Sequence, residues 1–327
     1  MRLPPAAGAA PDPVPTVNRY ITLLAARAPL LLALGVCIGL VVPSLSSIAR
    51  PLLGPSIWLL LVISAVRIDP SQAAGTVRRP VPVIAALCWM LFITPLLCWA
   101  VVGGLNGNSW LSVGLVTALV LMAATSPLMS TPALSRILGL DDAFAMMVLV
   151  LGSLALPFTA PAVALHLLGL DLGIDALAWS IDLTLFIGSA VVAGIVLRLF
   201  LKADRIAQAK GFLDLAIVFF LLTFAVAIMD GVADRLERET AFVLSVAGLA
   251  FASYVVLLLA GTIYGRLFGA RIGATLGFVN ANRNVGIFLA VLPAGAHPDI
   301  FLYFALWQLP MYMMPAVLKP VYRRLSL

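Results

Sequence analysis

Three asparagines and an arginine stand together in the segment VNANRNVG, which runs from Val279 to Gly286. The flanking runs ATLGF and IFLAVL are apolar, so these polar side chains interrupt a stretch that otherwise resembles a membrane span. An arginine at the centre of such a span costs on the order of 2.5–3.5 kcal/mol, and some partner must compensate it. A carboxylate, backbone carbonyls, water or an anionic substrate can do so. The candidate site residues in this segment are Asn280, Asn282, Arg283 and Asn284.

A second polar interruption is TSPLMSTP, from Thr125 to Pro132. Its two prolines remove backbone donors and clash with preceding carbonyls, so we expect a helix to unwind here. Unwound backbone at membrane depth survives only where protein or water covers it, and secondary transporters place such breaks at their binding sites. The candidate residues of this segment are Thr125, Ser126, Ser130 and Thr131, followed one turn later by Arg136.

Structural roles compete with functional ones at these positions. Arg283 is either a structural pin, hydrogen-bonded to carbonyls freed by the unwound segment, or a direct contact of a substrate or coupling ion, and the two roles are compatible. The hydroxyls of Ser126, Ser130 and Thr131 suit local capping as well as ligand contact.

Acidic residues near the spans also have two interpretations. Asp141 and Asp142 precede an apolar run, where a carboxylate caps a helix N-terminus. An ion pair with Arg136 is the alternative. Asp182 lies just inside a later apolar run and is a candidate for ion coupling.

Composition places these segments in a bilayer. The 327 residues are 63% hydrophobic and 10% charged, with a mean hydropathy of +1.12, whereas a soluble domain is about one-quarter charged. The formal net charge of +6 comes from basic residues between apolar runs, which is the pattern of membrane orientation and not of a nucleic-acid binder. Cys37, Cys88 and Cys98 all lie in apolar runs, so no disulfide framework is expected.

Apolar runs long enough to span a bilayer predict an all-α polytopic membrane protein with ten transmembrane helices. Residues 1–18, rich in Pro and Ala, are expected to form a disordered cytoplasmic tail. The expected spans are 28–48, 51–67, 80–104, 110–139, 143–169, 176–201, 212–229, 241–268, 272–293 and 300–318.

Basic residues orient these spans. With the N-terminus inside, fifteen Lys and Arg residues of the 20 fall in cytoplasmic segments and three in outer segments, while Arg136 and Arg283 fall in the interrupted spans. The positive-inside rule therefore predicts that both termini are cytoplasmic. An inner (plasma) membrane is the expected location.

An internal repeat accounts for the two interruptions. LPFTAPAV begins at Leu156 and LPMYMMPAV begins at Leu309, an offset of 153 residues, and each follows an interrupted span. Five spans per repeat put the second copy in the opposite orientation. We therefore predict two inverted five-helix repeats, residues 19–170 and 171–327, with broken helices four and nine crossing in the core.

This pattern resembles the bile acid:sodium symporter family. The resemblance is strongest over residues 125–169 and 277–292, including the run NRNVGIFLA. It implies a panel of spans one, two, six and seven beside a core of spans three, four, five, eight, nine and ten. It further implies substrate binding between panel and core near the crossing, and alternating access by movement of one against the other.

The chain departs from the family at the sodium ligands. The positions that the resemblance assigns to oxygen ligands hold Met90, Pro132, Ala133, Val279 and Arg283. None of these side chains supplies an oxygen, and a guanidinium repels a cation in the same space. A register shift would restore oxygens from Thr125, Asn280 or Asn282, so sodium dependence stays open at this point.

The expected function is a secondary transporter of a small organic anion by alternating access; if the assigned register of the sodium ligands is right, it works without sodium, either coupled to protons or as a uniporter. An ordinary sodium-coupled symporter is the second reading, and a passive channel or an intramembrane enzyme is the third. The sequence holds no HExxH, G-x-S-x-G or P-loop motif, so no enzymatic activity, cofactor or metal is expected. Lipid is an expected partner, whereas substrate identity, transport direction and oligomeric state are not determined by the sequence.

Overall fold

The fold is described from a computed structural model, over residues 28–67, 80–105, 111–168, 176–292 and 296–324. This part of the chain is almost entirely helical, and its one extended pairing is an isolated antiparallel bridge between Pro127 and Arg283. The tail expected at residues 1–18 lies outside the described residues.

The helices alternate with short connections. The first half contains α2 (Ala28–Val41), α3 (Pro43–Ala49), η1 (Arg50–Leu52), α4 (Leu53–Arg67), α6 (Pro80–Cys88), the π-helix η2 (Trp89–Ile93), α7 (Thr94–Leu105), α8 (Val113–Ala124), α9 (Thr131–Ile137), α10 (Asp142–Val163) and the π-helix η4 (Ala164–Leu168). The second half contains α11 (Ala176–Gln208), α12 (Lys210–Ala227), α13 (Val232–Arg238), α14 (Thr240–Gly265), η6 (Arg266–Phe268), α15 (Ala270–Ala281), α16 (Gly286–Val291) and α17 (Pro298–Arg324).

Seven helical stretches among the described residues are long and apolar enough to cross a membrane, so the protein is an all-α integral membrane protein. They are Pro43–Arg67, Pro80–Gly104, Asp142–Leu168, Leu177–Leu201, Gly211–Arg238, Thr240–Phe268 and Pro298–Arg324. The expected first, fourth and ninth spans are not among the seven. The fourth and ninth are each divided into two short helices, and α2 ends at Val41, earlier than the expected residue 48, because a new helix begins at Pro43.

Both expected helix breaks are confirmed. Helix α8 ends at Ala124 and α9 begins at Thr131, while α15 ends at Ala281 and α16 begins at Gly286. Proline by itself does not explain the breaks, since α10 and α17 run on through five internal prolines, Pro157, Pro161, Pro310, Pro315 and Pro320. At the two breaks the backbone groups that leave the helix instead find partners on another segment.

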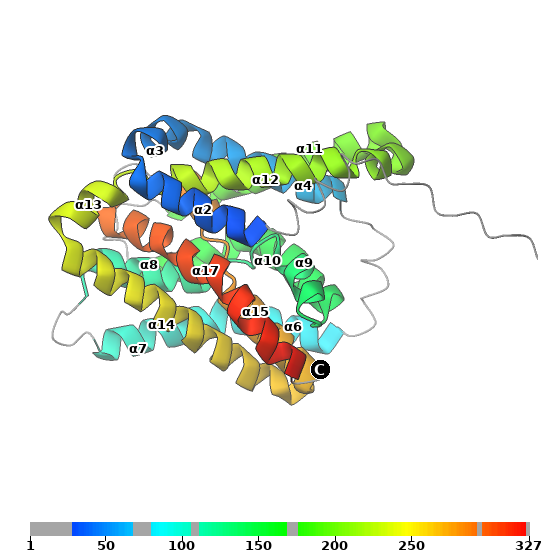
Figure 1. Ribbon diagram of the computed structural model, residues 1–327. Coiled ribbons are helices and arrows are strands. Elements are labelled where there is room, and N and C mark those ends of the chain that lie inside the picture. The colour runs from blue at the N-terminus through cyan, green and yellow to red at the C-terminus, as the bar shows by residue number, and fades with distance from the viewer. Residues whose placement is uncertain (1–27, 68–79, 106–110, 169–175, 293–295, 325–327) are drawn as a thin grey trace, which may run out of the picture.

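Helices of the first half of the chain pack against helices of the second half. Helix α2 packs against α12, and α4 packs against α11 and α12; in Figure 1 these helices run along the upper side of the molecule. At Gly194 of α11 the backbones come so close that an added Cβ would lie 2.5 Å from Ala65 Cβ and 2.9 Å from the Val62 carbonyl oxygen. Within the second half, α14 and α15 form another close pair, which lies below these helices together with α6, α7 and α8 (Figure 1).

The two short helices that follow the breaks have different surroundings. Helix α16 packs against α4 and α11, and none of residues 286–292 is exposed. Helix α9 packs against α10 and α15 and retains an exposed flank of Ala133, Arg136 and Ile137. The α4–α11 pair therefore covers the helix of the second break and leaves the helix of the first break open on one side.

Candidate functional site at the helix crossover

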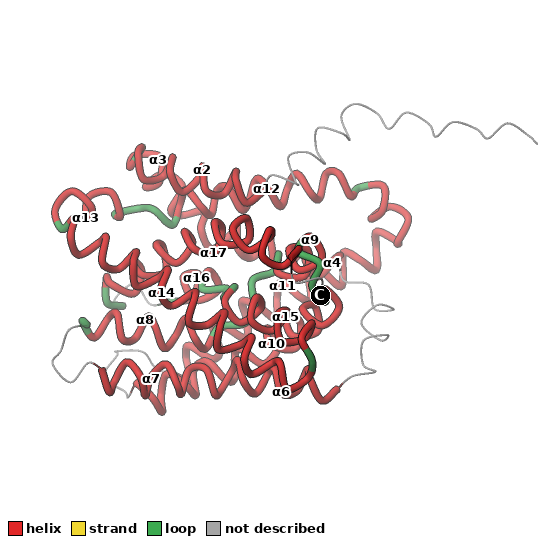
Figure 2. The backbone as a smooth tube through the Cα atoms, turned by 60° about the horizontal axis from the view of Figure 1, so that its bottom comes forward, coloured by secondary structure: helices red, strands yellow, loops and turns green. Residues whose placement is uncertain are grey.

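The two unwound segments cross and pair with each other. The Leu128 amide donates to the Asn282 carbonyl at 2.8 Å, and the Asn284 amide donates to the Ser126 carbonyl at 2.9 Å. Figure 2 shows these loops, between α8 and α9 and between α15 and α16, in the interior of the helix bundle. The predicted meeting of the fourth and ninth spans is therefore present in the structure.

Arg283 lies at the centre of this crossover and is fully buried. Its Nε donates to the Asn280 carbonyl at 2.8 Å, and one Nη2 donates to Asn280 Oδ1 at 2.5 Å. Its Nη1 donates to the Thr125 carbonyl at 2.7 Å and to the Met90 carbonyl at 3.2 Å. Hydrogen bonds from a charged group contribute about 1.5–3 kcal/mol each, so four of them offset the cost of burying the guanidinium.

Each carbonyl that Arg283 binds has lost its usual helical donor. The residue four positions after Asn280 is Asn284, whose amide is committed to Ser126, and Thr125 is the C-cap of α8, after which the chain leaves the helix. The Met90 carbonyl lies in η2, where the bonding partner is five residues on, and that residue is Pro95, which has no N–H. The guanidinium thus satisfies the acceptors that three helices leave unpaired.

The guanidinium meets no carboxylate among the described residues; all four of its partners are neutral oxygens. The structural role considered for Arg283 in the sequence is therefore present. Its positive charge is solvated by dipoles but is not neutralised by a counter-charge. An anion that approaches the crossover would gain from that charge, by about 2 kcal/mol at 8 Å with an effective dielectric constant of 20.

The other polar residues of the first break are mostly committed to local structure. Thr125 Oγ1 donates to the Met122 carbonyl at 2.9 Å, and Ser126 Oγ accepts from Ser153 Oγ at 3.2 Å. Thr131 is fully buried and its hydroxyl has no hydrogen-bond partner among the described residues. Ser130 is half-buried at the start of α9 and makes no side-chain cap.

The three asparagines of the second break differ in how far their amides are used. The Asn280 amide donates to the Leu257 carbonyl at 2.8 Å, and the Asn282 amide donates to Tyr254 Oη at 3.0 Å and to the Phe278 carbonyl at 2.7 Å. The Asn284 side chain makes no hydrogen bond to any described residue and is slightly accessible, at 6%. Asn284 is therefore the asparagine that is available to a ligand.

Asn284 also lies where the crossover meets α12. A Cβ placed on Gly286 would be 3.3 Å from Asn284 Oδ1 and 3.2 Å from the ring of Phe224. Phe224 belongs to α12, which packs against α2 and α4. The free amide therefore faces the junction between the crossover and that group of helices.

Arg136 does not belong to this site. Its side chain is 76% exposed and is paired with Asp142, through Nε at 2.7 Å and Nη2 at 2.5 Å. Asp141 caps α10 by accepting the Phe144 amide at 2.9 Å. Both structural roles considered for the acidic pair are thus found, one on each residue, and the placement of Arg136 at the crossover was wrong. The cause is its position on α9, where Thr131 and Ser135 occupy the inner face and Arg136 the outer one.

The sequence reasoning also missed a polar network at the other end of the molecule. Asp299, at the start of α17, accepts from Ser112 Oγ at 2.5 Å and from Arg235 Nη1 at 2.8 Å. His297 Nδ1 lies 3.6 Å from Asp299. Ser112 is the N-cap of α8, so this network ties the first half-helix of one break to α13 and α17. The signal for it was an Asp in the first turn of a long apolar helix.

No model of a known protein family matches this chain, and no curated protein matches it in sequence. The residues of the crossover therefore provide the observations on which a function is inferred.

Proposed function

We propose that this protein is a secondary transporter of a small organic anion, which binds beside the crossover and is moved by alternating access. The observation that carries the proposal is the Arg283 guanidinium, fully buried where two broken helices meet and unopposed by any described carboxylate. Broken helices at corresponding places in two halves of a chain are the usual position of a transporter substrate site. The resemblance to the bile acid:sodium symporter family leads to the same proposal.

The repeat proposed for the chain is supported by how the helices pair. If spans one to five correspond to spans six to ten, then α2 with α12 is the counterpart of α11 with α4, and both pairs are in contact. The two acidic helix starts correspond as well. The Asp141 amide donates to Thr275 Oγ1 of α15, and Asp299 accepts from Ser112 at the start of α8. In each case the helix after one break contacts the broken helix of the other half.

We further propose that transport needs no sodium at the crossover. Arg283 binds three backbone carbonyls and one amide oxygen, which are the kind of neutral oxygens that a sodium ion uses. A fixed guanidinium in this place provides positive charge permanently and repels a second cation. The substrate would then gain from the buried charge and from the free Asn284 amide, whose N–H groups donate to carboxylate or sulfonate oxygens.

The test is a thermal-shift screen of the purified protein against small carboxylates and sulfonates, with and without sodium, followed by uptake of any hit into proteoliposomes. We expect stabilisation by an anion and none by sodium. Stabilisation that requires sodium would favour the ordinary sodium symporter instead, and the absence of any anion effect together with passive conductance would favour a channel.

Asn284 provides a variant that leaves the Arg283 contacts in place. Asn284→Asp keeps the side-chain size and adds a negative charge, so it should abolish anion-dependent stabilisation, whereas Asn284→Ser, the neutral comparison, should only weaken it. Equal effects of the two substitutions would show that charge at this position does not matter. Uptake that is unchanged in Arg283→Gln would overturn the role of the guanidinium.

A further inference from the structure

Asp182 is an exposed carboxylate in the second turn of the apolar span Leu177–Leu201, and it lines an open groove of about 570 Å³ between α11 and α16. Leu185, Phe186 and Ser189 follow Asp182 at helical spacing along the same face of α11, and Ala290, Val291 and Leu292 form the opposite wall. The groove therefore runs for about 10 Å along α11. A charged residue inside a span has a function by default, unless a partner explains it.

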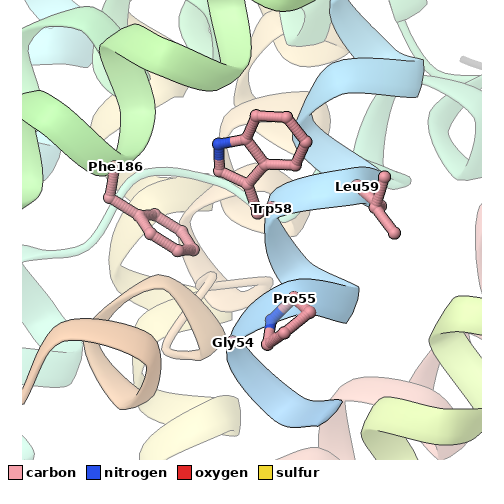
Figure 3. A pocket seen from close by; sticks show the side chains of 5 residues that line it. All are labelled: Gly54, Pro55, Trp58, Leu59 and Phe186. Carbon is pink, nitrogen blue, oxygen red and sulfur yellow. The ribbon is translucent and has the colours of Figure 1, made fainter.

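The neighbouring space is apolar. A second cavity of about 480 Å³ lies on the other side of Phe186 and is lined by Gly54, Pro55, Trp58 and Leu59 of α4. Figure 3 shows the rings of Phe186 and Trp58 facing this space. Trp58 Nε1 donates to Ser189 Oγ at 3.0 Å, and Ser189 in turn donates to the Phe186 carbonyl at 3.2 Å. The Ser189 hydroxyl is thus already in use, and Asp182 is the polar group of the groove without a described partner.

No described basic residue reaches Asp182. On the helices that pack against α11, Arg67 of α4 pairs with Asp214 of α12 at 2.7 Å, and Asp142 of α10 pairs with Arg136. Helix α16 contains no titratable residue, and the next charged side chain on α11 that is described, Arg198, is more than four turns away and donates to the Val66 carbonyl. The negative charge of Asp182 is therefore not compensated by the described residues.

The C-terminal end of α16, which lies across the groove from Asp182, makes an ionised carboxylate at this position less favourable still. Ala290 and Val291 end α16 and Leu292 is its C-cap, and a helix C-terminus carries a partial negative charge on its last carbonyl groups. A carboxylate and a helix C-terminus repel each other, while a protonated carboxyl can donate to one of those carbonyls. A single proton thus converts a repulsion between α11 and α16 into an attraction.

We propose that Asp182 is the coupling site of the transporter and that the ion it carries is a proton. This inference rests on the proposed function. With the proton bound, the carboxyl O–H donates to the last turn of α16 and holds α11 and α16 together. When the proton leaves to water, the carboxylate and the helix end separate, and the groove opens. Because α16 follows Arg283 by three residues, that movement is transmitted directly to the crossover. A metal cation would need several oxygen ligands, and the groove offers one free carboxylate.

The direct test is labelling of the full-length protein in liposomes with a hydrophobic carbodiimide, which reacts with protonated carboxyl groups inside membranes. Mass spectrometry of the peptides should find the adduct on Asp182, decreasing as pH rises and unaffected by sodium. Asp214 and Asp230, which are ion-paired with Arg67 and Arg50, are the internal comparison and should stay unlabelled. Labelling of Asp182 that sodium blocks would show a metal-ion site, and absence of labelling at acidic pH would overturn the proposal.

The second test measures contact between α11 and α16. Leu185→Cys and Val291→Cys line the same groove and are combined in a chain whose three native cysteines are replaced by alanine. Disulfide yield is compared between this pair and the pair carrying Asp182→Asn, a neutral mimic of the protonated residue. The ratio of the two yields cancels the effect of pH on the thiols. The yield with Asp182→Asn divided by the yield with native Asp182 should be near one at acidic pH. It should rise severalfold at alkaline pH, because only the native residue loses its proton there, and a constant ratio would refute a proton-dependent contact.

Neither readout depends on uptake. If labelling and cross-linking behave as expected but no anion is transported, the protonation site stands and the transporter proposal fails. If an anion is transported but Asp182 is not labelled, the transporter proposal stands and the protonation site fails.

Discussion

Replacing Arg283 by methionine tests whether the guanidinium holds the crossover together. The substitution leaves the carbonyls of Met90, Thr125 and Asn280 without a donor, and it leaves Asn280 Oδ1 with only the longer contact from Thr94 Oγ1 at 3.4 Å. An unsatisfied buried acceptor costs about 1–3 kcal/mol. Removing the charge returns about 2.5–3.5 kcal/mol. The expected net loss of unfolding free energy is therefore roughly 3–5 kcal/mol, a large share of the 5–15 kcal/mol of a typical protein.

The assay is reversible unfolding in mixed detergent micelles, followed by tryptophan fluorescence. Arg283→Lys should fall between the native protein and Arg283→Met, because an ammonium has three donors but not the planar fork that reaches three helices. Arg271→Met is the matched comparison on the same helix α15; Arg271 is exposed and makes one long contact of 3.5 Å to the Leu140 carbonyl, so its loss should change stability by about 0.5 kcal/mol or less. Equal stability of Arg283→Met and Arg271→Met would refute the account of the crossover.

Two further substitutions test the packing and the polar network. Gly194→Ala should lower the unfolding free energy by about 1–3 kcal/mol, because the new Cβ would lie 2.9 Å from the α4 backbone. Gly188 on the same helix has open space around it, so Gly188→Ala should be neutral or stabilising. Equal effects of the two substitutions on the unfolding free energy would contradict the close approach of α11 and α4. Asp299→Asn should cost about 1–3 kcal/mol in the same unfolding assay, since it weakens the bonds from Ser112 and Arg235, and Asp142→Asn, which breaks an exposed ion pair, should cost under about 1 kcal/mol. The Asp299 network would be ruled out as a stabilising feature if the two acidic variants unfolded alike.

The helix breaks could be predicted from the sequence because their cause is local. Two prolines separated by hydroxyl residues disfavour helix in TSPLMSTP, and three amides with an arginine are costly in NANRN unless the backbone there is irregular. Prolines alone would have given false breaks in α10 and α17, where the helix continues. The difference is tertiary, since only the two crossing segments offer each other backbone partners.

The partners of Arg283 could not be read from the sequence in full. The Met90 carbonyl is free only because η2 is a π-helix and because Pro95 follows at the right distance, and the first of these conditions is not a sequence pattern. The position of Arg136 failed for a related reason. A seven-residue helix has no long periodic pattern, so its inner face could be assigned only once α10 and α15 were seen to pack against it.

The bonds of Arg283 also constrain how this protein can change shape. The Arg283 side chain joins η2, the end of α8 and the end of α15, and the two unwound segments are hydrogen-bonded to each other through their own amides. Moving any one of these segments away from the others would expose several unpaired polar groups to hydrocarbon at once. A large rearrangement therefore has to move the hydrogen-bonded crossover as one rigid body. The surfaces that slide must lie at its edges, where α16 meets α4 and α11.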